Sequence, residues 1–307
     1  MLSRNQRRWI LTCIVLALLM PGTATAGDTE DADELKTILQ RMARTASLFR
    51  DTALRFACRE KITWRGSGQP GRATFEYVFV YDDQKGFQDY RTAPFIGKRR
   101  KAPKEISPDD EGVPWYLRSA YLWVFVFRDS RQLLHHYRIA GEEEVLGVPA
   151  VKIDFEPILP IRAKLNDWYG TAWVDPRLGQ LLKIVAYSPQ DYKTKRLWED
   201  YRAANITDET RATFGTITTL FTEEHNGLRF PGKVTLEHAR YIGQRDHNAD
   251  EIRAKRRTLP DGPQVAEKKR VGGSRTMTLL RVVQTYRNYE FFSVRTADEI
   301  EEFILGK

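Results

Sequence analysis

The first apolar positions after residue 27 recur with the period of a helix. Residues 28–33 are rich in Asp and Glu, and apolar side chains then follow at steps of three and four. Acidic side chains stabilise a helix N-terminus, and this spacing is typical of a helix with one buried face. That face consists of Leu35, Ile38, Leu39, Met42, Ala43, Ala46 and Phe49. We therefore expect one amphipathic helix at the start of the folded region.

After Asp51 the period of the apolar positions changes to two. In the first run with this period, every second residue is apolar, and only Glu60 interrupts the pattern. These side chains are Leu54, Phe56, Cys58, Ile62 and Trp64. A glycine-rich turn at residues 66–71 follows, and residues 73–81 alternate again. Because a period of two indicates a strand with one buried side, the two runs predict a β-hairpin.

Further strand patterns follow at short intervals to the end of the chain. They lie at residues 122–127, 135–140, 145–155, 169–174, 180–187, 212–223, 233–242 and 277–292. Turn signals occur at Gly141, Asp175–Gly179 and Asn226–Gly227. A short helix is expected at residues 297–305, with acidic residues in its first turn.

The order of these elements predicts a mainly β protein with flanking helices. The strands do not alternate with helices, which argues against a parallel α/β fold. A run of hairpins this long curls into a barrel, a half-barrel or a sandwich. We expect a curved antiparallel sheet with the N-terminal helix packed on it.

The first 26 residues have the organisation of a secretory signal peptide. Three arginines among the first eight residues precede an apolar run at residues 10–20, and Ala24-Thr25-Ala26 matches the small-x-small cleavage pattern. The apolar run is about half the length that spans a bilayer, so a permanent anchor is the weaker alternative. The sequence predicts cleavage near Ala26 and a periplasmic or secreted protein.

Charge and cysteine content narrow the range of functions. The chain has 49 basic and 41 acidic residues, and removal of residues 1–26 takes away three Arg and no acid, which leaves a net charge of +5. This mild excess suits solubility or contact with anionic headgroups and is far from the footprint of a nucleic-acid-binding protein. Cys58 is then the one remaining cysteine, so no internal disulfide is expected.

Motifs for catalysis or metal binding carry little weight in this sequence. Gly66–Gly71 matches G-x-G-x-x-G, but it joins two strands rather than a strand and a helix, so we interpret it as a turn. The adjacent His135 and His136 point to opposite faces of a strand, and no histidine has a zinc-site spacing. The chain has no G-x-S-x-G, P-loop or H-E-x-x-H motif. We therefore expect neither an enzyme nor a bound metal or cofactor.

Two basic stretches are candidates for contact with anionic surfaces. One consists of Lys98, Arg99, Arg100 and Lys101, and the other lies within residues 253–270. Each can be a solvated loop. The functional alternative is contact with lipid phosphates or an acidic partner, because clustered Lys and Arg attract anionic surfaces.

Two segments of the chain carry a resemblance to a known family. They are GTAWVDPRLGQLLKIVAYSP at Gly170–Pro189 and LRFPGKVTLE at Leu228–Glu237. Together with the initial helix and the hairpins, they resemble the LolA-like family of periplasmic lipoprotein carriers, over roughly residues 30–295. The resemblance implies that residues 27–307 form a single half-barrel domain. It also implies that helices cover a concave apolar face that receives acyl chains.

Strand parity supplies candidate lining residues for such a face, because side chains two apart on a strand share a face. They are Phe75, Tyr77 and Phe79 on one strand, Trp123 and Phe125 on a second, and Trp173 with Ile184 on the hairpin around Asp175. The opposite parity is also apolar in the first two strands, so which face is concave stays open. We expect an exported protein that binds lipid or lipoprotein acyl chains. The alternative is a non-catalytic envelope interaction or structural module with a filled core.

Overall fold

The computed structural model describes most of the predicted folded region. The described residues are 26–50, 55–66, 70–82, 86–93, 104–106, 120–158, 168–203, 211–242, 275–291, 302, 305 and 306. The signal peptide up to residue 25, both basic stretches and most of the predicted C-terminal helix lie outside them. The chain divides into two compact units, Met1–Thr37 and Ile38–Lys307, and the second contains the sheet.

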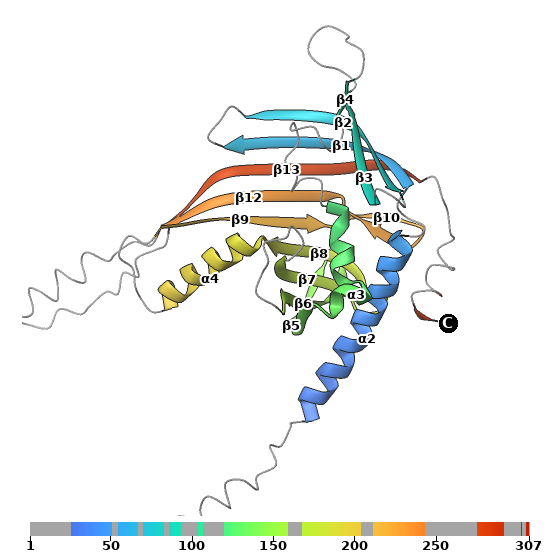
Figure 1. The fold of residues 1–307 in the computed structure, drawn as a ribbon, viewed down its shortest axis with the longest axis vertical. Helices are drawn as coiled ribbons and strands as arrows, with labels where there is room; N and C mark the ends of the chain where they lie inside the picture. The colour runs from blue at the N-terminus through green and yellow to red at the C-terminus, as the bar shows by residue number, and fades with distance from the viewer. Residues whose placement is uncertain are drawn as a thin grey trace, which may run out of the picture. The chain divides into compact units, whose positions relative to one another are not determined.

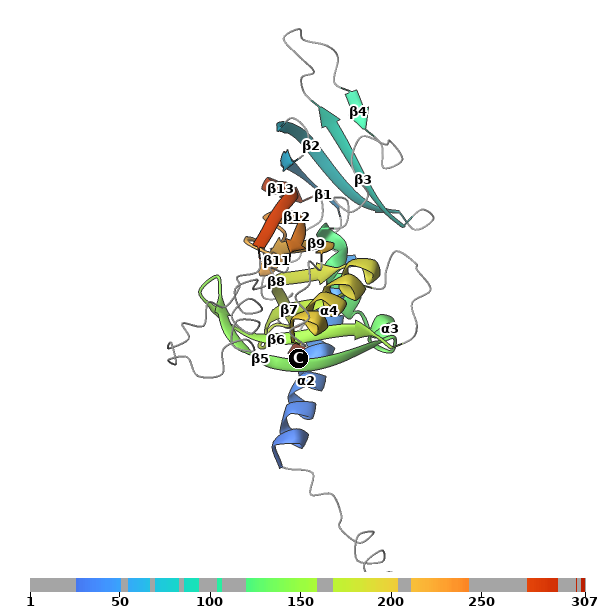
Figure 2. The ribbon, with the colours of Figure 1, turned by 90° about the vertical axis from the view of Figure 1, so that its left-hand side faces the viewer.

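One curved, unclosed antiparallel sheet forms the framework of the larger unit (Figures 1 and 2). Its strands are β1 (Arg55–Gly66), β2 (Gly71–Asp82), β3 (Gly86–Ala93), β4 (Lys104–Ile106), β5 (His135–Val145), β6 (Val148–Pro157), β7 (Tyr169–Asp175), β8 (Gln180–Tyr187), β9 (Arg211–Leu220), β12 (Lys233–Ile242) and β13 (Arg275–Phe291). The spatial order of these eleven strands is β4-β3-β2-β1-β13-β12-β9-β8-β7-β6-β5. A separate ribbon pairs β10 (Glu223–His225) with β11 (Leu228–Phe230). The expected mainly β fold with a curved antiparallel sheet is confirmed.

The registers divide the sheet into two faces. Residues directly opposite each other in an antiparallel pair point to the same side. Thr219 of β9 lies opposite both Ile184 of β8 and Val234 of β12, and all three are buried. We call the side that carries these three residues the inner face and the opposite side the outer face. The same registers extend the inner face across the sheet to Ile153, Phe155, Ala172, Ala186, Ile217, Glu60, Phe75, Tyr77, Gln284 and Tyr286.

The C-terminal half of helix α2 (Ala26–Leu48) packs on the sheet. The side chains of its predicted apolar face from residue 38 onward are mostly buried, as expected from their spacing. Two polar side chains also attach the helix to the turn between β7 and β8. Arg41 Nη1 donates to Pro176 O at 2.6 Å, and Thr45 Oγ1 donates to Leu178 O at 3.2 Å. Within the described residues, no helix is both long and apolar enough to cross a bilayer.

A charged cluster interrupts the apolar inner face near one end of the sheet. The Arg91 guanidinium of β3 donates to both carboxylate oxygens of Glu60 on β1, at 2.5 and 3.0 Å, and to Asp89 Oδ2 at 2.6 Å. The pair spans the intervening strand β2, where the guanidinium lies 4.8 Å from the centroid of the Tyr77 ring. Burial alone would lower the pKa of Arg91, but the charge and hydrogen bonds of Glu60 raise it above its ordinary value. Arg91 therefore stays charged although its side chain is 2% exposed.

Three parts of the predicted element order are corrected by the structure. Residues 122–127 form no strand, because the 3₁₀ helix η3 (Ala120–Phe127) includes them. Gly141 lies inside β5 at a bulge with a φ of 121°, and the chain turns at Leu146–Gly147 instead. Helices α3 (Asp129–Gln132) and α4 (Pro189–Ala203) were not predicted. A continuous apolar run such as 122–127 has no period that separates a strand from a buried helix.

Replacing Arg91 by Ala should strongly destabilise the fold, because Glu60 and Asp89 would remain buried with no cation beside them. We expect a loss of about 3–5 kcal/mol in the free energy of unfolding, measured by denaturant titration. The matched control is Arg59→Ala on the same sheet. Arg59 pairs with Glu76 at 3.4 Å with both side chains more than half exposed, so its loss should cost less than about 1 kcal/mol. Equal losses in the two variants would contradict this assignment.

Candidate functional site

The lining residues predicted on β2 lie together on the inner face. Tyr77 and Phe79 are 1% and 2% exposed, and Phe75 is also buried. The Phe79 ring stacks on Phe56 at 5.5 Å, and the Tyr77 ring meets Tyr286 edge-on at 5.7 Å. These aromatic side chains therefore form one packed cluster beside the Arg91 ion pair. Ile184 lies on the same face of the sheet, several strands away on β8.

Trp173 lies on the outer face, away from Ile184. Ala172 is the residue of β7 opposite Ile184, and its neighbour Trp173 pairs with Lys183. The Trp173 indole donates to Glu143 at 2.9 Å, and Lys183 Nζ lies 3.9 Å from its ring centroid. The prediction that Trp173 and Ile184 share one face is therefore wrong. Alternation predicts which residues of one strand share a face. It does not predict how the two strands of a hairpin are paired, and this hairpin contains a bulge after Trp173 that shifts the pairing.

Trp123 and Phe125 belong to η3 rather than to a strand. We call Ala120–Phe127 the apolar cover, because its sequence has no polar group apart from the Tyr121 hydroxyl and the Trp123 indole, and because Phe127 packs on the inner face of β5 and β6. The Phe127 ring lies 5.6 Å from Tyr137 of β5 and 5.5 Å from Phe155 of β6. Trp123 is buried and meets Trp168 edge-on at 5.0 Å, whereas Phe125 is half-buried.

Hydrogen bonds from outside hold the apolar cover in place. The side-chain amide of Gln132 on α3 donates to Phe127 O at 2.7 Å and to Leu39 O of helix α2 at 2.8 Å. The Tyr137 hydroxyl donates to Val126 O at 3.0 Å. Burial raises the pKa of Tyr137 above its usual value, so this hydroxyl stays protonated and keeps donating. Figure 1 shows η3 and α3 alongside the end of α2.

The backbone of the apolar cover is held by its surroundings rather than by its own preference. Runs of 3₁₀ helix longer than three or four residues are uncommon because their hydrogen-bond geometry is poor. The cover extends over eight residues, and its aromatic and valine side chains favour strands. The conformation of the cover therefore depends on its tertiary packing.

Sequence patterns missed the residues that fix the cover. Gln132 lies in a short polar segment with no periodicity, so nothing in the sequence marks it. Phe127, Tyr137 and Phe155 were recognised as apolar positions but not as neighbours, because their contacts join separate elements. Within the described residues, no group of three His, Cys, Asp or Glu side chains lies close enough together to hold a metal ion.

Replacing Gln132 by Ala should loosen the cover selectively. The variant loses two hydrogen bonds, at a cost of about 1–3 kcal/mol, so amide exchange at residues 120–127 should accelerate at least about tenfold while β9 and β12 are unchanged. The control is Gln190→Ala, an exposed glutamine at the start of α4. Unchanged exchange in the Gln132 variant would show that the amide does not hold the cover.

The chain was compared with known families, curated proteins and solved structures. No family model and no curated protein sequence matches it. Among solved structures, it is similar to a DUF1329 family protein from Desulfovibrio piger, with a TM-score of 0.41 and 11% identity over 88% of this chain and 98% of that chain. It is also similar to a putative outer membrane lipoprotein-sorting protein domain from Vibrio parahaemolyticus, with a TM-score of 0.42 and 8% identity over 87% and 98%. A third is a LolA superfamily protein from Nitrosomonas europaea, with a TM-score of 0.34 and 11% identity over 85% and 96%. One of these three structures is thus from the LolA superfamily, the family that the sequence resembles.

Proposed function

We propose that this protein is an exported, non-catalytic binding protein that receives lipid or lipoprotein acyl chains on the inner face of its sheet. The observation that supports this most is the apolar cover. It places aromatic and aliphatic side chains on the inner face, in a backbone conformation that those residues do not favour. An acyl chain offers the same chemistry and can replace it.

The free energy gained by burying an acyl chain can be compared with the free energy lost when the cover opens. Each methylene group removed from water contributes about 0.8 kcal/mol, so about ten methylenes of an acyl chain contribute about 8 kcal/mol. Displacing the cover costs its aromatic contacts and the hydrogen bonds of Gln132 and Tyr137 to Phe127 O and Val126 O. Each aromatic pair contributes about 0.5–1.5 kcal/mol beyond the area that it buries. Opening the cover also exposes the buried Trp123, Val124 and Phe127, at about 1.5–3 kcal/mol each, so the acyl chain must fill the space that they leave.

The alternative is an interaction or structural module whose interior is filled by its own side chains. The close packing of Tyr77 and Ile184, which are 1% and 0% exposed, favours it for the parts of the inner face around β2 and β8. The half-buried Phe125 favours binding at the cover instead. The two candidate functions differ in one measurable property, which is whether an apolar ligand enters beneath the cover.

Binding of a fluorescent fatty-acid probe to the purified protein tests the acyl-chain proposal. The native protein should bind the probe, and Phe125→Asp should lower the affinity at least about tenfold, because a carboxylate would be placed in the apolar contact. Binding should also change the emission of Trp123, since the cover moves away from Trp168. A Trp123→Phe variant should lose this change in emission, which assigns the change to Trp123.

The matched control for Phe125→Asp is Leu133→Asp, because Leu133 is 80% exposed just beyond the cover. It should bind the probe as the native protein does. Far-UV circular dichroism establishes that both variants fold. Unchanged probe binding by a folded Phe125 variant, or no binding by the native protein, would favour the filled-core module.

Export is tested separately by the N-terminus of the protein. Protein recovered from the cell envelope should begin at or near Gly27, because the charge and apolar pattern of residues 1–26 directs signal-peptide cleavage after Ala26. An Ala24→Arg and Ala26→Arg double variant should retain the uncleaved segment. A cytoplasmic pool with the full-length N-terminus would rule export out.

In an exported protein, Lys98, Arg99, Arg100 and Lys101 would be available to an anionic membrane surface.

A further inference from the structure

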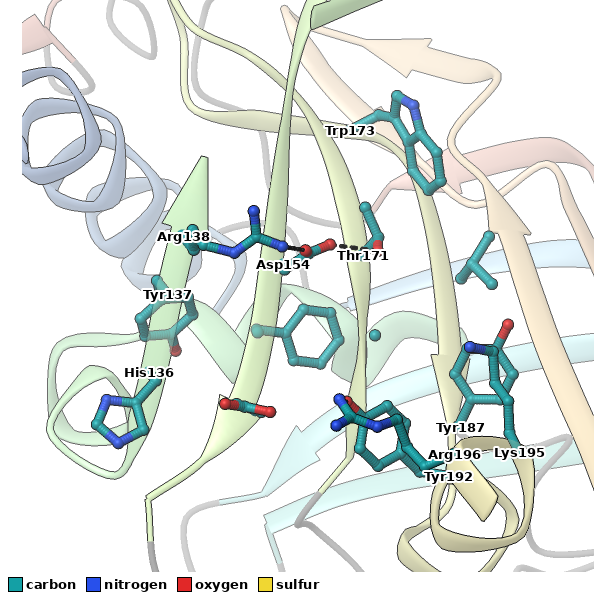
Figure 3. Close-up of a pocket in the computed structure, with 14 residues that line it drawn as sticks. His136, Tyr137, Arg138, Asp154, Thr171, Trp173, Tyr187, Tyr192, Lys195 and Arg196 are labelled. Carbon is teal, nitrogen blue, oxygen red and sulfur yellow. Dashed lines mark hydrogen bonds and ion pairs between the residues drawn. The ribbon is translucent and has the colours of Figure 1, made fainter. Parts of the chain in front are cut away.

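A second candidate site lies on the outer face, between helix α4 and strands β5–β8. It is a pocket of about 600 Å³. Its floor is made by residues of the four strands, most of them outward-facing, and one wall is made by Tyr192, Lys195 and Arg196 of α4 (Figure 3). Phe127 of the apolar cover contacts Tyr137 and Phe155 from the inner face, and both of these residues also line the pocket.

The wall of this pocket is fixed to the sheet. Asp191, in the first turn of α4, accepts a hydrogen bond from Gly215 N of β9 at 2.8 Å, and its own amide donates to Ser188 Oγ at 3.2 Å. Further along the helix, Trp198 is buried against Phe214. The pocket therefore has a defined shape rather than a mobile rim.

Aromatic rings form one end of the pocket. Tyr192 of α4 stacks on Tyr169 of β7 with 4.0 Å between ring centroids and an interplanar angle of 12°. Tyr187 of β8 lies 6.4 Å from Tyr192. The cations of α4 lie beside these rings, with Lys195 Nζ 5.4 Å from the Tyr187 ring centroid and Arg196 Cζ 5.9 Å from the Tyr192 ring centroid.

Most charges around the pocket are already paired. Arg138 of β5 forms an ion pair with Asp154 of β6, which also accepts a hydrogen bond from Thr171 at 2.7 Å. Lys195 forms an ion pair with Glu199 at 2.6 Å. Figure 3 shows the Arg138–Asp154–Thr171 row along the floor and the α4 side chains beside it.

Two charges of opposite sign that line the pocket lack an ion-pair partner among the described residues. Arg196 of α4 makes one weak hydrogen bond, to the Tyr192 hydroxyl at 3.4 Å. That contact, and at longer range the carboxylates of Asp200 and Glu156, raise the pKa of Arg196. Glu156 of β6 lines the same pocket, and these two described residues form no ion pair with each other.

We propose that this pocket binds a small zwitterion, with its anionic oxygens at Arg196 and its ammonium group at Glu156. A ligand with both charges would compensate both side chains at once, whereas a ligand with one charge compensates only one. The guanidinium offers paired donors to a carboxylate or phosphate, and the Glu156 carboxylate accepts hydrogen bonds from an ammonium group. Free amino acids and phosphoethanolamine headgroups share this chemistry.

Calorimetric titration of the purified full-length protein tests this proposal with four probes. Alanine and glycerophosphoethanolamine carry both charges, ethanolamine carries only the cation, and inorganic phosphate carries only the anion. At least one of the two zwitterions should bind at least about tenfold more tightly than either singly charged probe. Binding of alanine alone would identify an amino-acid site, and binding of glycerophosphoethanolamine alone would identify a lipid-headgroup site.

Variants then assign the binding to the pocket. Arg196→Gln and Glu156→Gln should each weaken zwitterion binding at least about tenfold, and both residues are exposed, so the fold should be retained. Lys193→Gln is the control, because Lys193 is an exposed cation of the same helix that does not line the pocket. The proposal is overturned if neither zwitterion binds at about 10 mM. It is also overturned if a singly charged probe binds as tightly, or if the two variants bind like the control.

Discussion

The inner face of the sheet must be covered, and the rest of the structure depends on that constraint. An eleven-stranded sheet that curves without closing presents a long apolar surface that would otherwise meet water. Helix α2 covers part of it from Ile38 onward, and the apolar cover lies over β5 and β6. The two covers differ in what holds them. The helix has the spacing of an amphipathic helix and two hydrogen bonds to the β7–β8 turn, whereas η3 depends on packing and on Gln132. The acyl-chain site that we propose lies at the cover whose conformation depends more on its surroundings.

The Arg91 cluster shows that the inner face is not uniformly apolar. A buried ion pair gains little net stability, because desolvation offsets much of the attraction. Its geometry instead fixes the pairing of strands, since Arg91 reaches from β3 across β2 to Glu60 on β1. A one-residue slip of β3 would turn Arg91 to the outer face and leave Glu60 buried without its cation. The cluster therefore specifies the register at the end of the sheet where the edge strands are short.

Much of the sheet could be predicted from the alternation of apolar and polar residues. The elements and contacts that could not be predicted have physical causes. The strand at residues 233–242 coincides with β12, because alternation and the flanking turn residues agree there. Glu60 was recognised only as an interruption, since its partner Arg91 lies two strands away. Helix α4 has one buried apolar anchor, Trp198, and no apolar stripe, so periodicity could not reveal it. Its start did carry a signal. Ser188 caps the helix by accepting from the Asp191 amide, and Pro189 occupies the first helical position.

The two faces of the sheet differ in their side-chain chemistry. The inner face presents aromatic and aliphatic side chains beneath the apolar cover, and the outer pocket presents charges of both signs beside helix α4. One layer of sheet lies between them, and its successive side chains point alternately to the two faces. Phe155 of β6 contacts the cover, and its neighbour Glu156 lines the outer pocket. Movement of the backbone at this point of β6 would reach both sites. Strand β5 has the same arrangement, because Tyr137 contacts the cover and its neighbours His136 and Arg138 line the outer pocket.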